Sequence, residues 1–166
     1  MTRTVLVINC GSSSLKFALY NQDVTKPVVT GLAEALSTAE AQIKISHGED
    51  KSETTTIAGA EHGAAIEFIL MQLEGRYSLK ETLMAVGHRV VHGGEAFSSA
   101  TLISDKVLSS IRDCNALAPL HNPANILGIE LLQQSYPSVA QVAVFDTAFH
   151  QTMPDYAYHY ALPRTL

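Results

Sequence analysis

Residues 5–20, VLVINCGSSSLKFALY, join two apolar runs through a short polar loop. Gly11, Ser12 and Ser14 offer backbone N–H groups and small side chains, which suit a loop that lies against phosphate oxygens. Lys16 adds a compact positive charge on a flexible stem that can reach a polyphosphate. The segment therefore suggests phosphate binding, and the alternative is an ordinary hairpin with a polar turn.

This loop differs from a P-loop, which needs a second Gly directly before its Lys and then a helix. Here Ser14 and Leu15 precede Lys16, and the apolar and aromatic residues 17–20 favour a strand over a helix. We therefore predict a β-hairpin whose tip faces phosphate.

A second segment, GHRVVHGGE at residues 87–95, places Arg89 in an otherwise apolar strand bounded by glycines. A guanidinium stays charged, is costly to bury without an anion, and pairs with carboxylate or phosphate through two parallel hydrogen bonds. Arg89 is therefore a candidate anion ligand, and the alternative is a structural salt bridge to an internal Asp or Glu. Val91 and Leu120 could form an apolar wall beside a small acyl group, or they belong to the core.

A third segment, VAVFDTAFH at residues 142–150, ends an apolar strand with Asp146. Functional sites of open α/β sheets collect at the carboxyl ends of strands. A carboxylate there could orient an attacking oxygen, take up a proton or hold a metal-bound water. The alternative is that Asp146 caps the following turn.

Four of the seven histidines lie in or near these segments: His88, His92, His121 and His150. None shows the HExxH spacing of a zinc site, so we interpret them as hydrogen-bonding groups around an anionic pocket. His121 directly precedes a predicted helix and is the one that we expect to contact substrate. For the others, a satisfied structural His is the alternative.

Nucleophilic catalysis is not indicated by the serines or the cysteines. Ser12 and its neighbours lack the GxSxG pattern of a hydrolase. Cys10 and Cys114 are isolated, without CxxC or zinc spacing, which is typical of free thiols in a reducing cytosol.

The elements that must position these residues change character along the chain. In the first half, the hairpin is followed by predicted strands at 28–36, 41–46 and 52–57, with a turn at 47–50. These indicate a mostly antiparallel sheet of about five strands.

The second half alternates between helices and strands. We predict helices over 61–73, with Gly75 as the stop, from Ser104 to about Cys114, and from Asn122 to about Ser135, with Asn122 as the cap and Pro123 in the first turn. Strands are predicted at 83–91 and 139–145, and one more element at 156–162. This order indicates an α/β fold, a mixed sheet of about five strands with helices packed on it.

Composition limits the remaining function classes. With 166 residues, 46% of them apolar and 16% charged, the chain is long and apolar enough for one folded domain. The net charge of −5 and the lack of a basic run argue against nucleic-acid binding. No apolar stretch has the length of a membrane span, and the N-terminal residues lack the apolar region of a signal peptide.

Three segments together resemble the acetate kinase family: NCGSSSLKF, GHRVVHGGE, and APLHNPANILGIE followed by VAVFDTAFHQTMP. The resemblance implies a ribonuclease-H-like domain of the actin-like ATPase superfamily. It also implies reversible transfer of the ATP γ-phosphoryl group to acetate, giving acetyl phosphate and ADP, with Mg²⁺.

The resemblance implies a role for each matching residue. Asn9 would help to hold the metal, and Lys16, with the loop residues Gly11, Ser12 and Ser14, would contact the nucleotide phosphates. Arg89 would bind the substrate carboxylate or acyl phosphate, and Asp146 would be the acid/base or orienting group. Val91 and Leu120 would line the methyl pocket, with His121 near the substrate.

The resemblance covers only the family's N-terminal domain, so we expect residues 1–166 to be one domain of a two-domain, cytoplasmic and homodimeric kinase, inactive by itself. Two alternatives remain open. One is a propionate kinase, because a single methylene gives little discrimination. The other is a non-catalytic module that binds anions or nucleotides.

Overall fold

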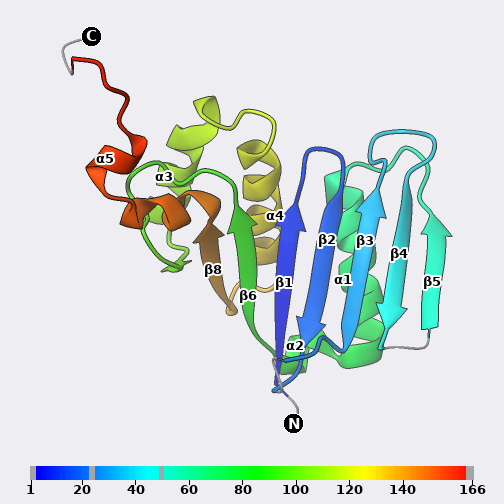
Figure 1. Cartoon of the computed structure of the whole chain (residues 1–166). Helices are drawn as coiled ribbons and strands as arrows, with labels where there is room; N and C mark the ends of the chain where they lie inside the picture. Colours follow the sequence, from blue (N-terminus) through cyan, green and yellow to red (C-terminus); the bar gives the residue numbers. More distant parts are fainter. Residues whose placement is uncertain (1–2, 23–24, 49–50, 164–166) are drawn as a thin grey trace.

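A single mixed sheet organises the chain in the computed structural model, which describes residues 3–22, 25–48 and 51–163. Its eight strands lie in the order β5-β4-β3-β2-β1-β6-β8-β7 (Figure 1). The strands are β1 (Thr4–Cys10), β2 (Leu15–Tyr20), β3 (Val29–Glu34), β4 (Gln42–His47), β5 (Lys51–Thr56), β6 (Leu83–Val90), β7 (Thr101–Leu102) and β8 (Ala140–Phe145).

The sheet has an antiparallel half and a parallel half. Strands β1 to β5 pair antiparallel in chain order, whereas β6 pairs parallel with both β1 and β8. The short strand β7 closes the far edge antiparallel to β8. The carboxyl ends of β1, β6 and β8 therefore meet at one edge of the sheet, where functional sites of α/β folds collect.

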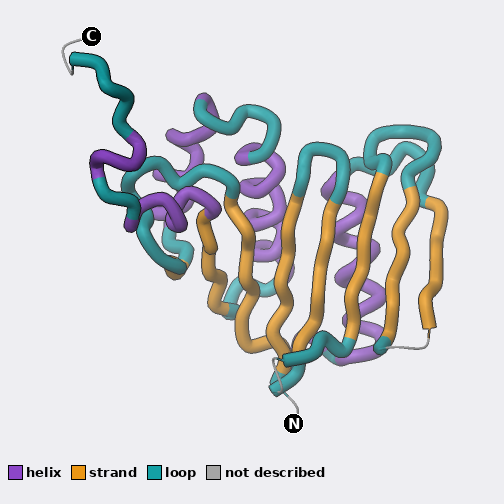
Figure 2. The backbone as a smooth tube through the Cα atoms, viewed as in Figure 1, coloured by secondary structure: helices purple, strands orange, loops and turns teal. Residues whose placement is uncertain are grey.

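Helices cover one face of this sheet. Figure 2 shows α1 (His62–Tyr77) and α4 (Asn122–Ser135) behind the strands, and the smaller helices α2 (Leu79–Thr82) and α3 (Asp105–Asp113) complete this layer. The core joins the inward strand side chains to the apolar helix faces. Its largest fully buried side chains are those of Leu6, Ile8, Leu15, Leu19, Ile43, Ile66, Ile69, Leu73, Leu79, Ile111, Ile129 and Leu132.

The prediction of an α/β fold with a mixed sheet is confirmed, but the count of about five strands is wrong. Five antiparallel strands are present in the first half, as expected. The two later strands, β6 and β8, join the same sheet on the free side of β1, and the two-residue β7 is too short to give a pattern in the sequence.

Helix α1 is longer than predicted, because Gly75 lies inside it rather than after it. The packing of Leu73 and the half-buried Tyr77 outweighs the cost of about 1 kcal/mol for an interior Gly. The helix ends instead at Ser78, which has φ 51° and donates its N–H to the Glu74 carbonyl.

The observed ends of the other helices agree in part with those predicted from the sequence. Ser104 caps α3, accepting the Val107 N–H at 3.4 Å, as predicted. The cap assigned to Asn122 is wrong, because His121 is the residue that precedes α4 and the Asn122 side chain is used elsewhere. The element predicted at 156–162 is reduced to the four-residue helix α5 (Asp155–Tyr158).

The turn predicted at 47–50 is described only in part. Glu49 and Asp50 of the predicted turn at 47–50 lie outside the described residues. Among the residues that the structure does describe, none of the helices is long and apolar enough to span a membrane.

Candidate anion-binding site

Three of the predicted site residues meet at the carboxyl edge of the central strands. Asn9 lies near the end of β1, Arg89 near the end of β6, and Asp146 directly after β8. The Arg89 Nε donates to Asp146 Oδ1 at 3.0 Å, and Nη1 donates to Asn9 Oδ1 at 3.2 Å. A second hydrogen bond joins Arg89 Nη2 to Asp146 Oδ2, so the carboxylate is held by two parallel bonds.

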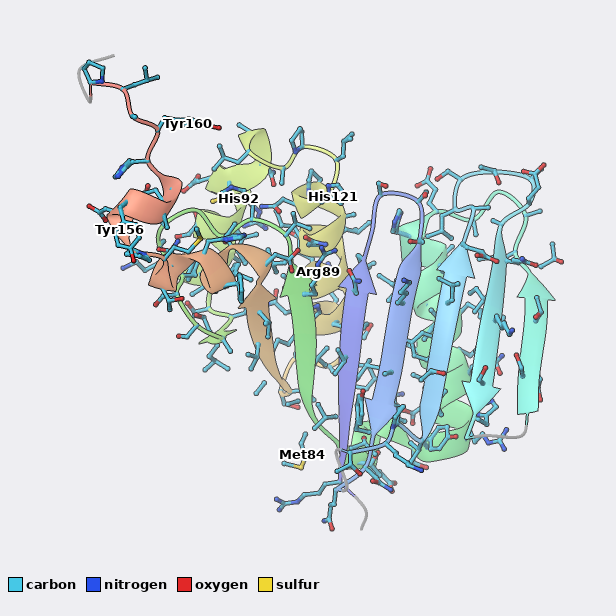
Figure 3. The ribbon with its side chains drawn as sticks, viewed as in Figure 1. Met84, Arg89, His92, His121, Tyr156 and Tyr160 are labelled. Atoms are coloured by element: carbon cyan, nitrogen blue, oxygen red, sulfur yellow. The ribbon has the colours of Figure 1, made fainter. Side chains whose placement is uncertain are left out.

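This ion pair is accessible to solvent, because the side chains of Arg89 and Asp146 are 40% and 44% exposed. Figure 3 shows Arg89 at the upper end of β6, at the edge of the sheet where His121 also lies. The expected alternative, a salt bridge to an acidic residue, is therefore present, but it is not internal. Because the pair is open to solvent, an anion from solution can reach Arg89 and compete with Asp146 for the same two parallel bonds.

The polar loop lies beside this cluster. Lys16 is directly opposite Asn9 in the β1–β2 register, so the two side chains are cross-strand neighbours on one face. A shallow groove of about 290 Å³ adjoins Lys16 and contains a second cation, Lys44 of β4. Leu32 separates the two lysines, since it is opposite Lys16 on one side and Lys44 on the other. The positive charges thus continue away from Arg89 along the sheet.

The hairpin tip is fixed at both ends. The Gly11 N–H donates to the Ser14 carbonyl at 2.7 Å, which closes the turn. The Gly11 carbonyl accepts a hydrogen bond from His62 Nε2 at 2.7 Å, which ties the loop to the start of α1. A Cβ on Gly11 would lie 3.1 Å from Ser14 Oγ, so a small residue suits this position.

Helix α4 bonds the chain through two buried asparagines, Asn125 at the ends of β1 and β6 and Asn122 farther along, at His92. Asn125 donates Nδ2 to the Cys10 carbonyl at 2.6 Å and accepts the Val91 N–H at 3.1 Å. Asn122 accepts the His92 N–H at 3.1 Å and donates to the His92 carbonyl at 2.9 Å. Sequence reasoning missed both roles, although two amides spaced by three residues before an apolar helix face were the available signal.

The chain after β6 turns sharply around glycines. The Gly93 N–H donates to Thr147 Oγ1 at 3.1 Å, which links this turn to the residue after Asp146. A Cβ on Gly93 would lie 2.5 Å from the Phe145 ring, and Gly94 has φ 61°. Both positions therefore require Gly, in agreement with the bounded strand seen in the sequence.

His88 is structural rather than part of an anionic pocket. It is 3% exposed, and its Nε2 lies 2.7 Å from Gln141 Oε1. Burial lowers the pKa of His88 to about 4, so the ring is neutral at physiological pH. The alternative of a satisfied buried His is thus the one observed.

The remaining candidates are less closely organised. Val91 is half-buried and Leu120 is 72% exposed, so their pairing around a methyl group stays a prediction. His121 is half-buried at the start of α4, and His92 Nδ1 accepts the Gly94 N–H at 3.0 Å. His150 lines a hollow of about 680 Å³ whose described lining has Glu95 and neither Lys nor Arg, which suits an anion less well than the Arg89 edge.

Cys10 does not act as a nucleophile in this arrangement. The side chain is 2% exposed, and burial raises the pKa of its thiol to about 12. A reactive cysteine needs a lowered pKa and access to solvent, and Cys10 has neither.

A divalent metal fits this edge only together with substrate phosphates. Within the described ranges, no group of three or more His, Cys, Asp or Glu side chains converges. The oxygens on offer are those of Asn9 and Asp146. Mg²⁺ is commonly bound by one or two carboxylates, waters and substrate phosphates, so this donor set suits it.

Comparison with known proteins agrees with the residues that carry the resemblance. The Acetokinase family matches residues 4–166. Acetate kinase 1 of Vibrio vulnificus is 52% identical over all of this chain, which covers 42% of that protein. Acetate kinase of Chromobacterium violaceum is 50% identical, again over the whole chain and 41% of its own length. The chain thus spans about two fifths of these relatives.

Solved structures show the same fold. A propionate kinase from Francisella tularensis superposes with a TM-score of 0.89 at 45% identity, covering 98% of this chain and 41% of that one. The acetate kinase of Porphyromonas gingivalis gives a TM-score of 0.88 at 40% identity, with 98% and 42% covered. The expected actin-like, ribonuclease-H-like fold is confirmed, and the chain belongs to the acetokinase family.

Proposed function

We propose that this chain forms the acyl-phosphate side of a kinase that transfers the ATP γ-phosphoryl group reversibly to acetate, giving acetyl phosphate and ADP. The observation that carries this proposal is the convergence of Asn9, Arg89 and Asp146 at the strand ends beside Lys16. In a chain of the acetokinase family, this edge combines the donors and the carboxylate that phosphoryl transfer to a carboxylate needs.

Arg89 binds the anionic substrate in this proposal. When acetate or acetyl phosphate arrives, the guanidinium exchanges Asp146 for the substrate oxygens, with which it can form the same two parallel bonds. The released carboxylate of Asp146 then lies next to the reacting oxygen, where it orients the attacking group or takes a proton. Val91, Leu120 and His121 would line the methyl side.

In this proposal, the β1–β2 hairpin binds the phosphates of the nucleotide. Lys16 and the loop of Gly11, Ser12 and Ser14 would contact the phosphates, supported by the His62 bond to the loop. Asn9 and the substrate phosphates would hold Mg²⁺, which neutralises charge on the transferred group. Asn9 already accepts from Arg89, so its oxygen points into the cluster.

The whole-protein context is also proposed. The relatives are more than twice as long as the matched region, which supports a two-domain kinase with this chain as its N-terminal domain. We expect the complete kinase to be a homodimer in the cytoplasm and this chain alone to lack turnover. The free thiols Cys10 and Cys114 fit a reducing compartment.

Calorimetry with acetyl phosphate on this chain tests the binding half of the proposal. Arg89→Gln should weaken binding by about tenfold or more, because a charge-assisted bidentate contact is lost. Arg112→Gln is the matched control, since Arg112 is likewise half exposed and paired with a carboxylate, that of Glu130. Equal affinities for the wild type and Arg89→Gln would reject the assignment.

A coupled kinase assay separates the enzyme from a non-catalytic module. The expected result is acetyl phosphate binding without turnover for this chain, and turnover for a polypeptide of the relatives' length that contains it. If the longer polypeptide binds but shows no turnover, the module reading is correct instead.

A propionate kinase is the second candidate, because a solved structure described as a propionate kinase is 45% identical to this chain. Comparing kcat/KM for acetate and propionate in the longer polypeptide decides between them. One methylene is worth about 1–3 kcal/mol in such a pocket, so a preference of at least tenfold is expected. A preference for propionate would reject acetate as the substrate.

A further inference from the structure

We propose that Asn125 is a positioning residue for the anion site: its side-chain amide bridges the diverging ends of β1 and β6 and thereby holds Asn9 and Arg89 at a fixed separation. This inference rests on the proposed function only for what the site binds.

The two strands separate just where the site begins. The parallel β1–β6 ladder ends at the pair Ile8–His88, one residue before Asn9 and Arg89. On its other side, β1 stays paired with β2 as far as Cys10, and β6 stays paired with β8 as far as Val90. The gap therefore opens only between the two strands that carry Asn9 and Arg89.

The amide of Asn125 fills this gap as a peptide group would. Its Nδ2 donates to the carbonyl of Cys10, next to Asn9, and its Oδ1 accepts the N–H of Val91, two residues after Arg89. The two partners fix the orientation of the amide, because a reversed amide would place N–H against N–H and oxygen against oxygen. Asn125 is 2% exposed, so water does not compete for these bonds.

The Asn125 bridge sets the distance between Asn9 and Arg89. The bond from Arg89 Nη1 to Asn9 Oδ1 is 3.2 Å long and joins the same two strands on the opposite face of the sheet. Removing the bridge leaves the buried Cys10 carbonyl and the partly buried Val91 N–H without this partner, and the strand ends must shift to recover one. Arg89 would then lose its alignment with Asn9 and with a bound anion.

Asn122 provides a matched control on the same helix. It is fully buried and also bonds backbone groups, but its partners are His92 and the Ile111 carbonyl, beyond the strand ends. A purely structural role predicts that Asn122→Ala and Asn125→Ala lose stability and affinity together. A positioning role predicts that only Asn125→Ala disturbs Arg89.

The experiment observes the Arg89 Nε–H signal by ¹⁵N NMR in the ligand-free chain, assigned with Arg89→Lys, and the Kd for acetyl phosphate by calorimetry. In Asn125→Ala, the Nε–H signal should move toward that of a solvent-exposed Arg, and the Kd should rise about tenfold or more. In Asn122→Ala, the signal should stay in place and the Kd should change less than about twofold. Asn125→Ser, whose small hydroxyl can still bond one of the two backbone partners, serves if Asn125→Ala does not fold.

An unchanged Arg89 signal in the Asn125 variants would overturn the proposal, and so would an equal shift in Asn122→Ala. If the wild type binds no acetyl phosphate, the proposed function fails, and the Arg89 signal still decides the positioning role because it needs no ligand.

Discussion

At the scale of single residues, the pairing of Arg89 with Asp146 is the feature with the clearest chemical consequence. Each side chain is the other's main partner, and both are accessible. An anionic ligand can take the place of the carboxylate on the guanidinium. The displaced carboxylate then stays next to the bound ligand. In the proposed function, Asp146 would therefore compete with the substrate for Arg89 before acting on it.

This competition predicts opposite effects of Asp146→Asn on binding and on turnover. The variant removes the competing charge, so the affinity of this chain for acetyl phosphate should rise about two- to tenfold. Calorimetry measures it, with Asp113→Asn as the control for a general loss of negative charge. In the longer polypeptide the same variant should lose most of its kcat. Weaker binding by Asp146→Asn would show that the carboxylate does not compete.

His88 gives the chain a specific sensitivity to acid. Its folded pKa of about 4 lies below the value of about 6.5 that the unfolded chain has. As the pH falls below about 6.5, His88 is protonated in the unfolded chain but stays neutral in the folded chain. The free energy of unfolding therefore decreases by about 1.4 kcal/mol per pH unit until about pH 4. Urea titrations from pH 7 to pH 4.5 should show this slope.

The variant His88→Gln isolates this contribution, because Gln cannot titrate. The difference in unfolding free energy between the wild type and His88→Gln should shrink as the pH is lowered from 7. A difference that is constant with pH would mean that His88 has the same pKa in the folded and unfolded chain.

At the scale of elements, the helices and strands that can be predicted from the sequence are those whose apolar pattern and turn residues match the way they pack. The β1–β2 hairpin, the strand that carries Arg89 and the strand that ends before Asp146 were all found from apolar runs and turn residues. What the sequence could not supply is long-range: that β6 and β8 extend the first sheet, that Asn125 bonds the ends of β1 and β6, and that Asn122 bonds His92 instead of capping its helix. Such partners lie 30 or more residues away, where periodicity carries no information.

The two interior helix glycines show how packing decides the effect of one substitution. A Cβ on Gly128 of α4 would lie 2.7 Å from Cys10 Sγ, whereas a Cβ on Gly75 of α1 would meet nothing within 4 Å. Gly128→Ala should therefore destabilise the chain by about 1–3 kcal/mol through overpacking against β1. Gly75→Ala should stabilise it by about 0.5–1 kcal/mol, because Ala restricts the unfolded chain and favours the helix.

Urea denaturation of both variants checks this pair, and each is the control for the other. Equal effects of the two substitutions would contradict the close approach of α4 to β1.

At the scale of the whole molecule, the two halves of the sheet differ on the face opposite the helices. In the antiparallel half, outward positions carry Lys16, Thr30, Lys44 and Ser46, with the partly exposed Leu32 between the two lysines. In the parallel half, Val7 and Val144 point outward and are 40% and 51% exposed. Parallel strands are normally covered on both faces, whereas antiparallel ones tolerate water on one side. The exposed valines of this face therefore lie on strands that take part in parallel pairing.

This exposed apolar area should be detectable in the isolated chain. We expect the chain to bind an apolar dye such as ANS while folded, and the double variant Val7→Thr/Val144→Thr to bind markedly less, because it removes the two most exposed valines of the parallel strands. Threonine keeps the β-branched shape that suits a strand, so the unfolding free energy should change by less than about 1 kcal/mol.

Met71→Gln is the control, since Met71 is 59% exposed but lies on α1, on the helical side. Dye binding that falls equally in Met71→Gln would place the apolar surface elsewhere. Dye binding that falls only in the double variant would show that the dye binds at the parallel half of the sheet.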